Sequence, residues 1–179
     1  MVEQATKPLV TITGVSGYIG SHTCLSFLQD GGYRVRGTVR DSKNQAKIEP
    51  LRQAFGDLFD SLELVNADLL NAESIRNAVN GSDYVVHTAS PFMLTFESVD
   101  DAVKPAVEGT AAILEACKAN KVKRLVITSS VAAVYNVADE DVPEGDLYDE
   151  SNWSDLNCAA GKTAYIKSKI MAERAAWDF

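Results

Sequence analysis

The chain lacks long apolar runs. None of its 179 residues belongs to a hydrophobic stretch that approaches the length of a membrane span. Residues 1–7 are polar and lack the apolar segment of a signal peptide. The sequence therefore predicts a protein without membrane contacts that resides in the cytoplasm.

Cysteine and histidine are scarce. The three cysteines (Cys24, Cys117 and Cys158) are widely spaced and odd in number, so they match neither a metal-binding nor a disulfide pattern. We expect reduced thiols that pack as small side chains. Since there are only two histidines, His22 and His87, a histidine-based metal site is not expected, and the sequence predicts no metal.

The chain also lacks an excess of basic residues. Its net charge of −8 argues against a nucleic-acid backbone as partner. Eight acidic residues and no Lys or Arg lie between Asp139 and Asp155, and these eight account for the whole imbalance. Two interpretations stay open for this segment: a solvated loop, or an acidic lid near a substrate.

What is present is typical of a globular protein. Hydrophobic residues make up 46% of the chain and charged residues 23%, and the length predicts one domain over residues 1–179. Short β-branched runs alternate with longer helical patterns, which indicates βαβ units. The fold class predicted is therefore α/β, a Rossmann-like doubly wound parallel sheet in three layers. We expect strands at Leu9–Thr13, Tyr33–Val39, Leu62–Asn66, Tyr84–Thr88 and Arg124–Thr128. We expect helices at Ile19–Gln29, Asn44–Phe55, Ala72–Val79 and Val99–Lys118, and from Ala164 to the end.

Two segments depart from this regular alternation. Pro105 lies inside the fourth helical pattern and predicts a kink or a delayed helix start. Residues 135–161 form the one long irregular stretch, and a loop of that length in a compact domain is usually functional or disordered.

A glycine trio follows the first predicted strand and opens the first helix. Gly14 permits a tight turn, Gly17 lets the backbone approach a pyrophosphate, and Gly20 allows close packing of helix and strand. The helix N-terminus offers N–H groups and a partial positive charge to phosphates. In this strand–turn–helix context the motif predicts a dinucleotide site. A glycine-rich turn without a ligand is the alternative.

The end of the second strand indicates which dinucleotide is bound. An acid there favours NAD and an arginine favours NADP. Arg40 comes first, and Lys43 and Lys47 follow, so NADP is favoured. The alternative is that Asp41 takes a ribose hydroxyl. After the third strand, Asp68 is predicted to flank the adenine, or else to cap a helix.

Tyr165 and Lys169 are four residues apart, so a helix places them on one face. A nearby ammonium stabilises a phenolate and lowers the pKa of the phenol, which otherwise lies near 10. Ser130 follows the fifth strand, at the sheet edge where ligands bind in this architecture. The three residues predict carbonyl reduction or alcohol oxidation. The alternative is that Tyr165 is a half-buried helix residue.

Several motifs carry a family resemblance over essentially the whole chain. These are Thr13-Gly-x-x-Gly-x-x-Gly20, Thr88-Ala-Ser-Pro-Phe92, Thr128-Ser-Ser130, residues 148–155 and Tyr165-Ile-Lys-Ser-Lys169. The sequence resembles the extended short-chain dehydrogenase/reductase family, in the branch of dihydroflavonol 4-reductase, cinnamoyl-CoA reductase and yeast-type aldehyde/ketone reductases.

The resemblance implies roles for particular residues. It implies a catalytic triad of Ser130, Tyr165 and Lys169, with Ser129 as the fallback serine, and NADPH as cofactor. Phe92 and Val131 would border a small-molecule carbonyl or alcohol substrate. The positions expected to contact the cofactor are Gly14, Ser16, Gly17, Tyr18, Ile19, Gly20, Arg40, Lys47, Asp68, Leu69, Thr88, Ala89, Ser90, Thr128, Tyr165 and Lys169.

The resemblance also implies that relatives continue beyond the lysine helix, with further strands and a smaller C-terminal substrate lobe. We expect this chain, truncated after the lysine helix, to lack that lobe and to present an unpaired sheet edge. It would then be a natural truncation, a fragment, or a protein completed by self-association or by a partner. Three hypotheses follow: an NADP-dependent reductase, a non-catalytic NADP-binding module, and an NAD-dependent nucleotide-sugar epimerase or dehydratase.

Overall fold

The computed structural model describes residues 7–90, 97–135, 147–157 and 163–179. The chain divides into two compact units. The first comprises Met1–Ala89 and Glu115–Thr128, and the second comprises Ser90–Leu114 and Ser129–Phe179. The prediction of one domain over residues 1–179 stays a prediction.

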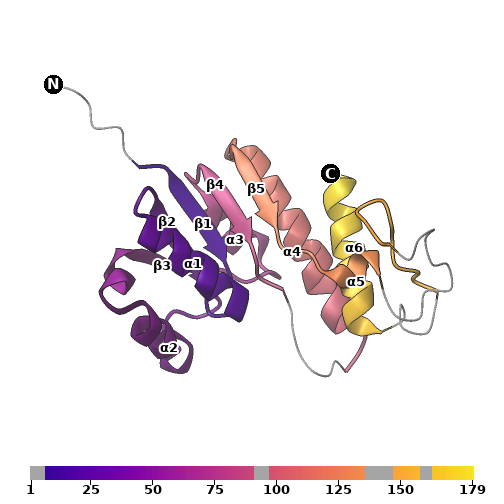
Figure 1. The fold of residues 1–179 in the computed structure, drawn as a ribbon, viewed down its shortest axis with the longest axis horizontal. Coiled ribbons are helices and arrows are strands. Elements are labelled where there is room, and N and C mark those ends of the chain that lie inside the picture. Colours follow the sequence, from indigo (N-terminus) through magenta and orange to yellow (C-terminus); the bar gives the residue numbers. More distant parts are fainter. Residues whose placement is uncertain (1–6, 91–96, 136–146, 158–162) are drawn as a thin grey trace. The chain divides into compact units, whose positions relative to one another are not determined.

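The first unit is built on a five-stranded parallel sheet (Figure 1). The strand order β3-β2-β1-β4-β5 is that of a doubly wound nucleotide-binding fold, and it confirms the predicted fold class. The strands are β1 (Leu9–Thr13), β2 (Arg34–Val39), β3 (Leu62–Asn66), β4 (Tyr84–His87) and β5 (Arg124–Ile127).

The helices agree with the sequence pattern to within one residue at either end, except at the C-terminus of the last. They are α1 (Tyr18–Asp30), α2 (Gln45–Phe55), α3 (Ala72–Val79), α4 (Asp100–Ala119) and α6 (Ala164–Trp177). Two short elements were not predicted: a 3₁₀ helix, η1 (Gly56–Ser61), and the four-residue α5 (Val131–Val134). Both are too short to show a periodic pattern of apolar residues.

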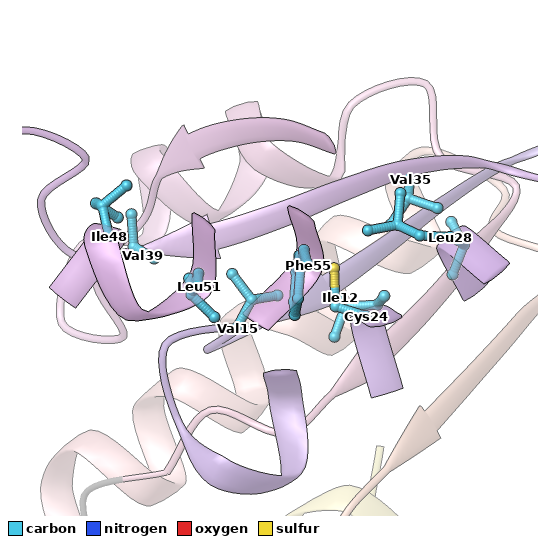
Figure 2. Close-up of a cluster of buried hydrophobic side chains, with 10 residues drawn as sticks. Ile12, Val15, Cys24, Leu28, Val35, Val39, Ile48, Leu51 and Phe55 are labelled. Carbon is cyan, nitrogen blue, oxygen red and sulfur yellow. The ribbon is translucent and has the colours of Figure 1, made fainter. Parts of the chain in front are cut away.

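Alternation along β1 separates the two faces of the sheet. Val10 and Ile12 are fully buried among side chains of α1 and α2, in the cluster shown in Figure 2. Thr11 points the other way, and its hydroxyl oxygen lies 2.7 Å from that of Ser82, just after α3. Arg36 of β2 likewise donates to the carbonyl of Ala78 in α3. Helices therefore cover both faces, as a three-layer arrangement requires.

Pro105 does not delay the start of α4. The helix begins at Asp100, so the delayed start is not observed, whereas the kink stays a prediction. Ser98 and Asp101 explain the early start, because the Ser98 N–H donates to the Asp101 carboxylate and the Asp101 N–H donates to the Ser98 hydroxyl. This reciprocal pair has the form of a capping box and satisfies two backbone donors at the helix N-terminus.

Two of the three cysteines are free, buried thiols in the first unit. Burial raises the pKa of Cys24 to about 12 and that of Cys117 to about 11. The expectation of packing thiols is confirmed for these two, and Cys158 lies outside the described residues.

Candidate functional site

The turn after β1 is a tight backbone cradle in the first unit. Gly14 has a φ of +74°, a conformation that side chains other than glycine rarely adopt. An added Cβ at Gly14 would also lie 2.9 Å from the Cα of Ala89. The turn therefore needs glycine here both for its backbone angle and for its contact with the segment after β4.

Gly20 is enclosed by the same turn. A Cβ there would collide with the Gly14 carbonyl group, whose carbon would be 2.8 Å away, and with the Thr88 hydroxyl at 2.8 Å. The predicted role of Gly20 in close packing is therefore borne out by the geometry, although its neighbours are the cradle itself and Thr88.

The N-terminus of α1 is not capped by any side chain in the described part of the chain. Gly17 is the N-cap residue, and an added Cβ there would lie 3.3 Å from the Gly14 carbonyl oxygen. The first-turn N–H groups of a helix have no intrahelical acceptors. With the helix dipole they give this cradle the chemistry of a phosphate site. Cβ atoms at Gly14, Gly17 and Gly20 would crowd this turn, so the glycines leave its backbone N–H groups accessible to the phosphates of a dinucleotide.

The Thr13 hydroxyl joins the cradle to the end of β4. It accepts the N–H groups of Thr88 and Ala89 at 3.2 and 3.1 Å, and it lies 2.8 Å from His87 Nδ1. Since its two lone pairs are occupied, Thr13 donates to Nδ1, and His87 carries its proton on Nε2. Thr88 in turn donates to the Thr13 carbonyl. This network holds Thr88 and Ala89 beside Gly14.

The residues predicted to select the dinucleotide are exposed. Arg40, Lys43 and Lys47 form no salt bridge with any carboxylate of the described residues. Asp41 is engaged locally, because its carboxylate accepts the Lys43 N–H at 2.9 Å. This bond uses only part of the acceptor capacity of the carboxylate, so the choice between Arg40 and Asp41 stays a prediction.

Asp68 does not cap α3. The N-cap is Asn71, whose side chain accepts the Ser74 N–H at 3.0 Å. Asp68 instead accepts the N–H of Leu70 at 2.9 Å, in a turn after β3. The helix-cap alternative was wrong, and contact of Asp68 and Leu69 with an adenine stays a prediction.

In the second unit, α6 brings Tyr165 to Ser130. The Tyr165 and Ser130 hydroxyl oxygens lie 3.5 Å apart, the outer limit of a hydrogen bond. Ser130 is the N-cap of α5, and its hydroxyl accepts the Ala132 N–H at 3.2 Å. That bond fixes the position of the Ser130 hydroxyl oxygen beside the phenol of Tyr165.

Lys169 lies one turn further along α6. Its Nζ is 5.8 Å from the centre of the Tyr165 ring and donates to the Ser90 hydroxyl at 2.9 Å. Burial lowers the pKa of Lys169, because desolvation disfavours the ammonium form. A partly desolvated cation beside a phenol stabilises the phenolate, which is the chemistry that the Tyr-x-x-x-Lys spacing predicts.

The partly buried charge of Lys169 has a cost in stability that can be measured. We expect Lys169→Met to raise the free energy of unfolding at pH 7 by about 1 kcal/mol, and Tm by about 2–4 °C, because it replaces a desolvated ammonium with an apolar chain. Because folding lowers the pKa of this lysine, the folded state binds fewer protons at this site than the unfolded state does. Its cost is therefore fully present below the lowered pKa and disappears as the pH rises through that pKa to 10.5.

Thermal unfolding of wild type and Lys169→Met between pH 7 and 10.5 checks this. The difference in Tm should close as the pH rises. Lys104→Met, at an exposed position of α4, is the matched control and should show no such closing. A constant difference between wild type and Lys169→Met across this range would contradict the expectation.

Ser129 has a different partner from Ser130. Its hydroxyl donates to the Glu173 carboxylate of α6, which also accepts the Trp177 indole N–H at 3.3 Å. Ser129 is therefore less suited than Ser130 to hold a substrate oxygen. Glu173 was not predicted, although its spacing of four from Lys169 places it further along the same side of the helix.

The remaining predicted positions are partly described. Ser16, Tyr18 and Ile19 are exposed in the cradle, and Thr128 and Val131 are exposed after β5. Phe92 and residues 139–146 of the acidic segment lie outside the described residues. The described residues contain no group of three or more His, Cys, Asp or Glu side chains that could hold a metal ion.

The family model that describes the NAD dependent epimerase/dehydratase family matches residues 10–179. The chain belongs to this family. That membership confirms the resemblance to extended short-chain dehydrogenases/reductases, since the similar proteins come from the branch that the motifs indicate.

Similar curated proteins are reductases. The chain is 42% identical to dihydroflavonol 4-reductase of Arabidopsis thaliana, over all of this chain and 46% of the relative. It is 42% identical to cinnamoyl-CoA reductase 1 of Arabidopsis thaliana, over 94% of this chain and 47% of the relative. The chain thus spans about half the length of the curated relatives it matches.

Similar solved structures include reductases as well. Yeast methylglyoxal/isovaleraldehyde reductase Gre2, complexed with NADPH, has 30% identity and a TM-score of 0.76 over 96% of this chain and 52% of that chain. Vestitone reductase from alfalfa has 33% identity and a TM-score of 0.75 over 97% of this chain and 52% of that chain. No helix in the described ranges combines the length and the apolar character needed to span a bilayer.

Proposed function

We propose that this protein binds NADPH and reduces an aldehyde or ketone carbonyl to an alcohol. The observation that carries the proposal is the approach of Ser130 Oγ to Tyr165 Oη, one helical turn from the desolvated Lys169. The reductases among the similar proteins support the same reaction class. NADPH supplies the hydride when bound.

The protein side chains supply the proton. Tyr165 donates its phenolic proton to the carbonyl oxygen as hydride reaches the carbonyl carbon, so that the C=O group becomes CH–OH. Ser130, fixed through the Ala132 N–H, donates a hydrogen bond to the same oxygen. Lys169 stabilises the phenolate left on Tyr165, which is reprotonated from solvent.

The first unit would hold the dinucleotide. The glycine cradle and the N-terminus of α1 suit the pyrophosphate, and Arg40 with Lys47 suits a 2′-phosphate. The exposed position of Arg40 after β2, with no salt bridge to a carboxylate of the described residues, supports NADP over NAD. It therefore also weighs against an NAD-dependent epimerase or dehydratase.

Arg40 provides a test of the cofactor preference. We expect Arg40→Ala to weaken NADPH binding about 10- to 100-fold, because a charge-assisted contact with the 2′-phosphate is lost, and to change NADH binding less than about threefold. Arg52→Ala removes an exposed arginine that contacts Phe59 and should leave both affinities unchanged. Calorimetric titration of each variant measures this, and equal losses for NADPH and NADH would remove Arg40 from the phosphate site.

Turnover tests the reaction itself. NADPH oxidation should be accelerated by at least one member of a panel of aliphatic and aromatic aldehydes and ketones. A second candidate function is NADP binding without turnover. It is the function favoured if NADPH binds with micromolar affinity and no member of the panel accelerates its oxidation beside a full-length relative as positive control.

A further inference from the structure

Three side chains of α6, spaced four residues apart, each contact a serine hydroxyl from elsewhere in the second unit. Tyr165 approaches Ser130, Lys169 donates to Ser90, and Glu173 accepts from Ser129. The proposed function uses the first two. The third pair joins residues 44 apart in the sequence.

We propose that Glu173 is a positioning residue that holds Ser129, and thereby sets the place of the Ser130 hydroxyl beside Tyr165. This inference rests on the proposed function for its consequence in catalysis. The contact between Ser129 and Glu173 is part of the structure in either case.

The segment Ser129–Ser130 has two attachment points on α6. Tyr165 and Glu173 are eight residues apart, which corresponds to about 12 Å along a helix axis. Ser130 is extended, with φ −152° and ψ 147°, so its side chain and that of Ser129 point in different directions. One attachment would leave the segment able to pivot, whereas two fix both its position and its direction.

The bond is also suited to this role by its chemistry. A hydroxyl that donates to a carboxylate forms a charge-assisted hydrogen bond, stronger than one between neutral groups. Ser129 is exposed, so competition with water keeps the net contribution of the bond to stability small. Its loss should therefore affect the precision of the Ser130–Tyr165 pair more than the melting temperature.

The Ala132 and Ala133 amides report directly on this segment. The Ala132 N–H is bound by the Ser130 hydroxyl, and the Ala133 N–H by the Ser130 carbonyl. If Ser130 moves, these two amides lose their acceptors and exchange with solvent faster. Amide exchange at Ala132 and Ala133 therefore reports on the hydrogen bond between Ser129 and Glu173 even if the protein shows no turnover.

The experiment compares the full chain with five variants. Ser129→Ala and Glu173→Ala break the bond, Ser129→Thr and Glu173→Gln preserve a donor or an acceptor, and Trp177→Phe is the matched control. The control removes the hydrogen bond from the Trp177 indole to Glu173 and leaves the bond to Ser129 intact. NMR-detected exchange at Ala132 and Ala133, kcat, and KM for NADPH are measured for each.

We expect Ser129→Ala and Glu173→Ala each to lower kcat about 10-fold, with KM for NADPH changed less than twofold. The double variant should be no worse than either single variant, because both remove one bond. Both should speed exchange at Ala132 and Ala133 about threefold or more. Ser129→Thr, Glu173→Gln and Trp177→Phe should resemble wild type.

Two results would overturn the proposal. One is exchange at Ala132 and Ala133 that is the same in Ser129→Ala, Glu173→Ala and wild type. The other requires a catalytically active wild type: exchange at Ala132 and Ala133 is faster in Ser129→Ala and Glu173→Ala, but their kcat equals that of the wild type. If the wild type reduces no carbonyl, the proposed function fails, while exchange still decides whether Glu173 holds the segment.

Discussion

Tyr165→Phe is expected to lower kcat for carbonyl reduction by about 10²- to 10⁴-fold, the range associated with loss of a general acid. Phenylalanine keeps the ring over which Lys169 lies and removes only the oxygen that approaches Ser130. The dissociation constant for NADPH should change less than about threefold. Steady-state kinetics and a binding titration on the same preparation measure both quantities.

A second tyrosine provides the control. Tyr33 packs edge-to-face against Phe27, at the other end of the sheet strands from the cradle, and has no part in the proposed chemistry. Tyr33→Phe should keep kcat within about twofold of wild type. If Tyr165→Phe retained more than a tenth of wild-type kcat, the phenol would not be the proton donor.

Gly20→Ala is expected to weaken NADPH binding at least about 100-fold, because its Cβ has no room beside the Gly14 carbonyl and the Thr88 hydroxyl. Relief of that clash displaces the backbone turn that is proposed to hold the pyrophosphate. Overpacking of this kind costs about 1–3 kcal/mol of stability. Calorimetric titration gives the affinity, and urea unfolding gives the stability.

Gly31→Ala, at the other end of α1, is the control that distinguishes a loss of stability from a loss of NADPH affinity. It has a φ of +69° and no atom near an added Cβ, so Gly31→Ala strains the backbone by about 1 kcal/mol without a clash. Its NADPH affinity should stay within twofold of wild type. Equal losses of affinity in Gly20→Ala and Gly31→Ala would mean that general destabilisation, and not the cradle, sets binding.

Helices and strands could be predicted where the residues that determine them lie within the element itself. The five strands follow from short β-branched runs, and the bounds of β1, β3 and α3 agree with the pattern to the residue. The start of α4 agrees with the periodic pattern to within one residue, because the capping pair of Ser98 and Asp101, and not Pro105, sets where the helix begins. Asn71 took the cap predicted for Asp68, three residues earlier in the same turn.

The candidate site was predictable where spacing within one element carries the information. Tyr165 and Lys169 are one helical turn apart, and the three glycines lie in one strand–turn–helix segment. Ser90 and Ser129 acquire their partners Lys169 and Glu173 only through the fold, across 79 and 44 residues. A single sequence holds no local signal for such pairs, so the distinction between Ser129 and Ser130 required the structure. The functional roles of these residues stay predictions.

The two buried thiols can report on local opening of the first unit through their reaction with alkylating reagents. Only the thiolate reacts with alkylating reagents, and burial keeps Cys24 and Cys117 protonated at neutral pH. Either sulfur becomes reactive only when the surrounding helix opens. The rate of alkylation at each sulfur therefore records how often α1 and the end of α4 separate from their neighbours, with no cysteine introduced by mutation.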